Sequence, residues 1–198
     1  MTLPTPRLIA ELGEIYEMYR TSALNKSYYG ALLARYQRFN TALEIAIAVG
    51  ATSSGVSGLA LWSSTQGKVI WGTIAAVSSV LAVAKPILQL NKTVERYSKL
   101  FTGHLENYLA LRALVTKIRR REALSKEMIQ EFELAEQRFI DLSRGDDPRT
   151  IARIHKTCEA EVRLAIPDTM LWMPRASKTP RKRKAPRKSS SLQAVAAE

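Results

Sequence analysis

Two long apolar segments, joined by a short polar connection, constrain the fold of this chain more than any other feature. The segments cover residues 41–62 and 69–90, 22 residues each, and no charged residue occurs between Glu44 and Lys68. A helix of this length measures about 33 Å, enough to cross the roughly 30 Å hydrocarbon core of a bilayer. A surface helix of a soluble protein presents a charged or polar face to water, and a gap of this size without charge is not typical of one. We therefore expect two transmembrane helices joined by a non-cytoplasmic turn at residues 63–68.

The basic residues around the two segments predict the orientation of this hairpin, because Lys and Arg concentrate on the cytoplasmic side of a membrane. The connection contains one basic residue, Lys68. A larger group lies near the outer ends of the segments: Lys26, Arg35, Arg38, Lys85, Lys92, Arg96 and Lys99. Both termini are therefore expected in the cytoplasm, on a protein that crosses the plasma membrane twice.

Lys85 and Pro86 lie near the end of the second segment and predict its boundary. From that position the long side chain of Lys85 can reach the headgroups. Pro86 lacks the amide that would bond one turn back, so we expect a hinge there.

The composition of the segments leaves one alternative to a membrane hairpin. They are rich in Ala, Gly and Ser rather than Leu, which also suits a hairpin buried inside a large soluble bundle. That alternative requires a partner large enough to cover every face of both helices.

Small residues recur every four positions along the segments, a pattern that lets helices approach closely. One interpretation is packing of the two helices of the hairpin against each other. The other is assembly of several hairpins around a polar lumen, with Glu44 at its cytoplasmic mouth. Hydroxyl groups do not decide between them, since Ser and Thr can also bond their own helix backbone. The candidate packing or pore-lining residues are Gly50, Thr52, Ser53, Ser54, Ser57 and Gly58 in the first segment and Gly72, Ala76 and Ser79 in the second.

Outside the segments the spacing of apolar residues predicts helices throughout, so the expected fold class is all-α. Residues 1–40 are expected to form cytosolic amphipathic helices, and residues 91–172 a cytosolic helical bundle or coiled coil. Ser125 is a predicted N-cap, and Gly145 and Pro167 are predicted to end helices. A heptad stripe after the second segment predicts packing within the chain, with self-association into a homo-oligomer as an additional possibility. The stripe consists of Val94, Tyr97, Phe101, His104, Tyr108, Leu111, Val115 and Ile118.

The sequence contains no pattern typical of a catalytic or metal site. Phosphate-binding and dinucleotide-binding glycine motifs are absent, and one cysteine with two histidines makes no zinc-binding set. His155, Cys158 and Glu159 share a helical face, but Cys158 also belongs to the apolar stripe of that helix, which favours a core position over a nucleophile. We expect no enzymatic activity, no cofactor and no metal.

Residues 173–198 have the proline, lysine and serine bias of a disordered segment. Much of the net charge of +12 lies here. Such cations are attracted to an anionic cytoplasmic leaflet, and nucleic acid is the less favoured partner because no aromatic residue is interleaved to stack bases. The residues expected to contact lipid or nucleic acid are Arg181, Lys182, Arg183, Lys184, Arg187 and Lys188.

Three stretches carry a resemblance to a known family. They read SYYGALLARYQRFN before the first segment, AKPILQLNKTVERYSKLFTGHLENYLALRALV from the end of the second, and CEAEVRLAIPDTMLW near residue 172. Together with two spans and a short turn they resemble the SLATT proteins, two-transmembrane effectors that associate with SMODS nucleotidyltransferases and SLOG sensor domains. The likeness covers roughly residues 8–172 and omits the basic tail.

This resemblance implies a bacterial antiphage effector in the inner membrane. A separate sensor or nucleotidyltransferase would supply the trigger, and the effector would form pores that permeabilise the membrane and arrest growth. Two alternatives remain: a non-conducting, membrane-anchored scaffold that recruits a cytosolic partner, and a membrane-tethered protein that binds nucleic acid through its tail.

Overall fold

The computed structural model describes residues 5–52, 65–148 and 150–174, and within these ranges the chain is helical, with no β-strand. α1 covers Thr5–Thr52 and α3 covers Thr65–Leu88. They are followed by α4 (Leu90–Arg121), α5 (Lys126–Ser143), α6 (Ala152–Ala165) and a short 3₁₀ helix, η1 (Asp168–Met170). The all-α class predicted from the sequence is confirmed for this part of the chain.

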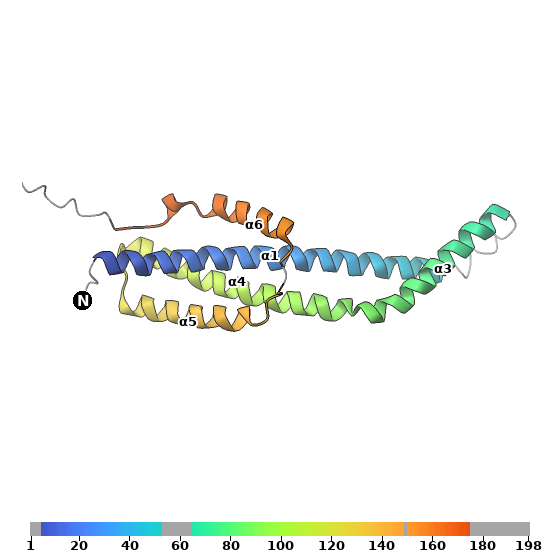
Figure 1. The fold of residues 1–198 in the computed structure, drawn as a ribbon, viewed down its shortest axis with the longest axis horizontal. Helices are drawn as coiled ribbons and strands as arrows, with labels where there is room; N and C mark the ends of the chain where they lie inside the picture. Colours follow the sequence, from blue (N-terminus) through green and yellow to red (C-terminus); the bar gives the residue numbers. More distant parts are fainter. Residues whose placement is uncertain (1–4, 53–64, 149, 175–198) are drawn as a thin grey trace, which may run out of the picture.

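The helices form an elongated rod (Figure 1). α1 and α4 run antiparallel and side by side along most of its length. α5 lies along one side of this pair and α6 along the opposite side, and α3 extends beyond the far end at an angle. The bundle therefore occupies one end of the rod and the apolar helix α3 the other.

α1 is a single helix of 48 residues, where the sequence predicted separate amphipathic helices followed by a span. No Gly or Pro occurs at residues 14–29 to end the helix. Buried residues also continue through this region, among them Leu12, Ile15, Tyr19 and Ser22. Because the packed face persists, the helix continues without a break from the bundle into the predicted first span.

The second helix of the hairpin starts and ends differently from prediction. α3 begins at Thr65, so the predicted turn at 63–68 is partly helical. The break between α3 and α4 lies at Gln89, which adopts a left-handed backbone conformation with φ 45°, three residues after the predicted hinge at Pro86. Pro86 removes one hydrogen bond, but the residues after it can still donate to the preceding turn, so the helix persists to Leu88.

The ends of α5 and α6 agree with the predictions made from Ser125, Gly145 and Pro167. The Ser125 side chain accepts a hydrogen bond from the Met128 amide at 3.4 Å and caps α5. α5 ends at Ser143, two residues before Gly145, and α6 ends two residues before Pro167.

Two adjoining clusters of buried side chains hold the bundle together. The larger one joins α1, α4, α5 and α6 and includes Leu12, Ile15, Leu111, Ile118 and Met128. The smaller one lies nearer α3 and joins Tyr28, Tyr29, Leu32, Tyr97, Leu100 and Cys158.

The heptad stripe of α4 lies within this core. Tyr97, His104, Leu111, Val115 and Ile118 are buried, and the stripe residues Val94, Phe101 and Tyr108 are partly buried. Of the two roles expected for the stripe, the structure shows packing within the chain. Because α1, α5 and α6 already cover these side chains, self-association through the stripe would require the bundle to open.

Candidate functional site: the membrane junction

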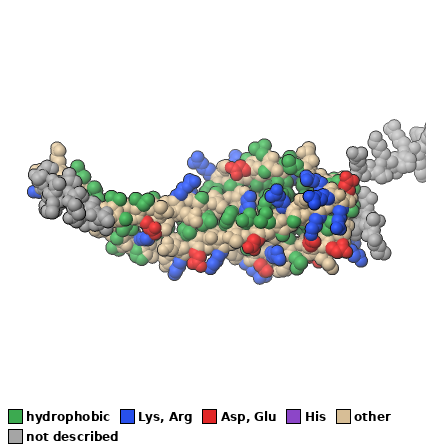
Figure 2. Space-filling view, turned by 180° about the vertical axis from the view of Figure 1, so that it is seen from behind, with side chains coloured by type: hydrophobic (Ala, Val, Ile, Leu, Met, Phe, Trp, Pro, Cys, Tyr) green, Lys and Arg blue, Asp and Glu red, His purple; other side chains and the backbone are tan. Residues whose placement is uncertain are grey.

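α3 presents an apolar surface that the rest of the described chain does not cover. Within the described residues, it is the one helix long and apolar enough to cross a membrane, with a mean hydropathy of 1.6 and 6% of its most apolar stretch buried. Val69, Val80 and Val83 are each about two thirds exposed, at 66%, 67% and 66%. Figure 2 shows the charged side chains gathered on the bundle instead. An exposed surface of this kind suits lipid better than water.

The end of α1 lies against α3 where Gly50 meets Ser78. A Cβ atom added to Gly50 would overlap the side chain of Ser78 and lie 3.7 Å from its Cα. Glycine is therefore required for this close approach of the two helices. The contact favours the simpler role predicted for Gly50, packing of the hairpin against itself.

The predicted packing residues of α3 lie on its exposed surface. A Cβ added to Gly72 would meet nothing within 4 Å, and Ala76 and Ser79 are exposed. The Ser79 hydroxyl donates to the Ala75 carbonyl at 2.8 Å, and the Thr73 hydroxyl donates to the Val69 carbonyl at 2.9 Å. The hydroxyl groups of Thr73 and Ser79 are thus satisfied by the backbone of their own helix.

Several predicted site residues lie outside the part of the chain that can be described. α1 ends at Thr52, and the side chain of this residue and all of Ser53, Ser54, Ser57 and Gly58 fall beyond that limit. The same holds for the tail cations Arg181, Lys182, Arg183, Lys184, Arg187 and Lys188. Their lumen-lining and lipid-binding roles stay predictions.

An ion pair joins the two helices at the base of the hairpin. Lys85 Nζ lies 3.0 Å from Glu44 Oε1, and the Asn40 side-chain amide donates to the same oxygen at 3.2 Å. The Lys85 and Glu44 side chains are about one third and one half exposed. The two opposite charges stabilise each other, and together they tie α1 to α3 beside the break at Gln89.

The break itself borders a cavity of about 430 Å³, lined by Asn40, Lys85, Pro86, Gln89, Leu90 and the two residues that follow. Asn40 Oδ1 is buried and has no hydrogen-bond partner within the described residues. We call Asn40, Glu44, Lys85, Pro86 and Gln89 the membrane junction, because α1 contacts the end of α3 here, beside the break between α3 and α4.

A second polar network clamps the loop between α5 and α6 onto the α1–α4 pair. Tyr97 donates to Asp147 Oδ2 at 2.6 Å, and the fully buried His104 lies with Nε2 3.2 Å from Asp146 Oδ1. The ring of Tyr29 stacks on His104 at 5.2 Å between centroids. Burial acts to raise the pKa of Asp146, but its interactions with His104 and Tyr29 outweigh burial and hold that pKa below its usual value.

The residues considered for catalysis do not form an activated nucleophile. Cys158 is buried, and burial raises the pKa of its thiol, as does the charge of Glu161. Glu159 pairs with Arg163 at 2.7 Å, and His155 packs against the ring of Tyr28. Thiolate character is what makes a cysteine reactive, so this arrangement suits a core position. Among the described residues, no group of three or more His, Cys, Asp or Glu side chains could hold a metal ion.

Comparison with known proteins gives no family. No protein-family model, curated protein or solved structure matches the chain. The likeness to SLATT proteins thus rests on the sequence stretches alone.

The sequence did not predict several residues of the membrane junction and of the polar network that holds the loop between α5 and α6. Asn40 and Gln89 lie in two of the stretches that resemble SLATT proteins, but nothing in those stretches predicts the buried side-chain oxygen of Asn40 or the helix break at Gln89. Asp146 and Asp147 follow Gly145 directly, and two acids after a helix end could have suggested a loop held by polar contacts.

Proposed function

We propose that the chain is a two-span protein of the inner membrane, in which a cytosolic helical bundle carries and controls a transmembrane hairpin. The observation that supports this most strongly is the uncovered apolar surface of α3 and of the end of α1. Ile45 and Val49 on α1 are 58% and 56% exposed, like the valines of α3. Placing these side chains in lipid removes a surface that water would disfavour.

The arrangement of the rod supports the proposed orientation. α1 and α4 are antiparallel neighbours, so the chain enters and leaves the hairpin on the same side. α1 and α4 both carry basic residues near the outer ends of the proposed spans, among them Arg38 on α1 and Lys92 on α4. This favours a cytoplasmic position for the bundle.

We further propose that the hairpin permeabilises the membrane when a partner or signal rearranges the bundle. A single hairpin at rest offers lipid an apolar face, because the hydroxyls of Thr73 and Ser79 are bonded to their own helix. Conduction would therefore need several hairpins to assemble, with other hydroxyls turned toward a lumen. The Glu44–Lys85 pair and the break at Gln89 support control at the membrane junction, where α3 can change its angle to α4.

The test is inducible expression in a bacterium, alone and together with the neighbouring genes, in the presence of a membrane-impermeant dye. Growth arrest with dye entry is expected. The triple variant Gly50→Leu, Ser54→Leu and Gly58→Leu should still insert into the membrane but admit no dye. A matched triple variant, Val69→Leu, Val80→Leu and Val83→Leu, changes lipid-facing positions and should behave like the unaltered chain.

Normal growth without dye entry, from a chain shown to be in the membrane, would reject the effector function. If a stable partner then copurified while the membrane potential stayed unchanged, the result would favour the non-conducting scaffold as the function of the chain. Salt-dependent retention of DNA or RNA that is lost on deleting residues 175–198 would instead favour the nucleic-acid binder.

A further inference from the structure

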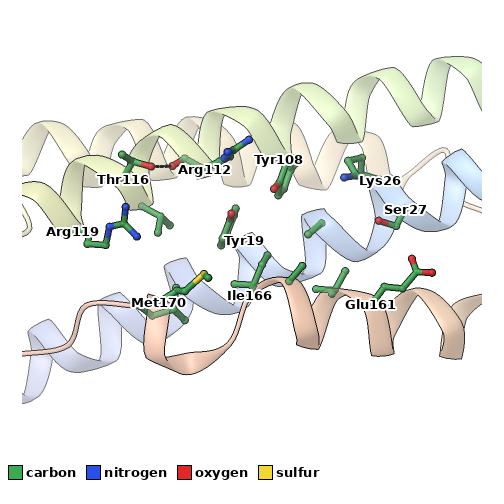
Figure 3. Close-up of a pocket in the computed structure, with 15 residues that line it drawn as sticks. Tyr19, Lys26, Ser27, Tyr108, Arg112, Thr116, Arg119, Glu161, Ile166 and Met170 are labelled. Atoms are coloured by element: carbon green, nitrogen blue, oxygen red, sulfur yellow. Dashed lines mark hydrogen bonds between the residues drawn. The ribbon is translucent and has the colours of Figure 1, made fainter.

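A cleft of about 490 Å³ lies between α1, α4 and α6, on the bundle and away from the hairpin. Figure 3 shows Tyr19 and Tyr108 projecting toward each other from α1 and α4, with Ile166 and Met170 on the opposite wall. The two tyrosine rings stack at 5.4 Å between centroids, with an angle of 8° between their planes. The floor of the cleft is thus aromatic and aliphatic.

The wall that follows α6 is anchored, so the cleft is a fixed part of the bundle. Tyr16 donates to the Trp172 carbonyl at 2.6 Å, and Arg20 donates to the Ile166 carbonyl at 3.1 Å and pairs with Asp168. These bonds hold the segment around η1 against α1.

The rim of the cleft carries a positive charge that the described chain does not neutralise. Lys26, Arg112 and Arg119 line it, and none of them forms an ion pair with a described residue, although Lys26 Nζ lies 4.7 Å from the centre of the Tyr108 ring. By contrast, Lys117 on the same helix pairs with Glu131 at 2.7 Å. Of the described residues that line the cleft, Glu161 is the one acid.

We propose that this cleft binds a small, soluble organic phosphate. Three cations and one carboxylate leave a balance that complements a phosphate monoester, whose charge at neutral pH is about −1.5 to −2. The guanidinium groups of Arg112 and Arg119 provide the planar donors that phosphate oxygens accept. The cleft is in the size range of small-molecule sites, so the organic part of the ligand packs on Tyr108, Ile166 and Met170.

The position of the cleft identifies a soluble ligand as the source of the phosphate, rather than a lipid headgroup. Tyr108 lies 18 residues beyond Leu90, where α4 begins at the membrane junction. That separation corresponds to about 27 Å along the helix, beyond the reach of headgroups at the bilayer surface. The ligand contacts α1, α4 and the segment around η1, and its binding does not depend on whether the hairpin conducts.

The experiment is isothermal titration calorimetry of the full chain in nanodiscs of neutral phosphatidylcholine, with 1-naphthyl phosphate as the probe. Saturable binding to one site per chain is expected, tighter than the binding of 1-naphthol or of inorganic phosphate. The double variant Arg112→Gln, Arg119→Gln removes two charged donors and should weaken binding by about 100-fold, at roughly tenfold for each. The matched control Arg121→Gln lies on the opposite face of α4, outside the cleft lining, and should bind like the unaltered chain.

Three results would overturn the proposal: no saturable heat, equal affinity for 1-naphthol, or equal weakening by Arg121→Gln. If the double variant were unfolded by circular dichroism, Lys26→Met would replace it, with at least fivefold weaker binding expected and unchanged binding counting against the site. A second series uses nanodiscs with phosphatidic acid. Unchanged affinity supports a soluble ligand, whereas a loss would show that headgroups compete for the cleft and would overturn that source.

Discussion

Replacing Leu111 by alanine tests whether the stripe of α4 is the core of a single chain. Leu111 is 0% exposed and belongs to the larger buried cluster with Leu12, Ile15 and Met128. Leu109, two residues earlier on the same helix, is 48% exposed and provides a matched control.

The expected loss follows from this difference in burial. Leucine to alanine removes three carbons, about 2.4 kcal/mol of transfer free energy, and an unfilled cavity adds to this. We expect the Leu111→Ala variant to lose about 3 kcal/mol of unfolding free energy, and the Leu109→Ala variant about 0.5 kcal/mol. For a chain of this size, 3 kcal/mol lowers the melting temperature by about 6 to 12 °C.

The assay is thermal unfolding of the full chain in detergent, followed by far-ultraviolet circular dichroism at two protein concentrations tenfold apart. A melting temperature that does not change with concentration is expected for an intramolecular core. Equal losses in the Leu109→Ala and Leu111→Ala variants would refute the assigned burial. A melting temperature that rises with concentration, together with a Leu111→Ala loss that depends on concentration, would show that the stripe joins separate chains.

Two further predictions concern the hairpin and the loop clamp. Gly50→Ala should speed limited proteolysis of α3 in detergent, because the added Cβ overlaps Ser78, whereas Gly72→Ala should not. Adding Ser78→Gly to the Gly50→Ala variant should restore the original rate of proteolysis. Equal rates for the two alanine variants would contradict the contact between Gly50 and Ser78. Because the folded chain lowers the pKa of Asp146, the stability that this carboxylate contributes is fully present above the ordinary aspartate pKa of about 4 and is lost as the pH falls through the lower folded value. Asp146→Asn should therefore reduce stability at pH 7 and flatten the acid limb of the unfolding curve below about pH 4, and an unchanged acid limb would argue against the interaction with His104.

Features that depend on neighbouring residues could be predicted from the sequence. The spacing of Leu111, Val115 and Ile118 identified buried positions because the helical period is a local property. The cap at Ser125 and the helix end before Pro167 follow from side-chain and backbone chemistry within one turn.

Features that depend on which helices meet could not be predicted in this way. The spacing of apolar residues predicts which face of a helix is buried but not which helix covers it. The stripe of α4 therefore could not distinguish packing within the chain from packing between chains. The pair between Glu44 and Lys85 joins residues 41 positions apart, and the cleft draws its cations from two helices. Gln89 adopts a left-handed backbone conformation that glycine usually occupies, so nothing in the sequence predicts that conformation there.

The uninterrupted length of α1 has a mechanical consequence. At 48 residues the helix measures about 72 Å, and it runs as a stiff strut from the free end of the bundle into the predicted first span, while its neighbour is jointed at Gln89. A displacement of α1 within the bundle would move its far end as well, whereas α3 can change its angle to α4 at the break. A continuous helix beside a broken one would thus convert a displacement inside the bundle into a relative movement of α3 and the end of α1, which in the proposed function lie in the membrane.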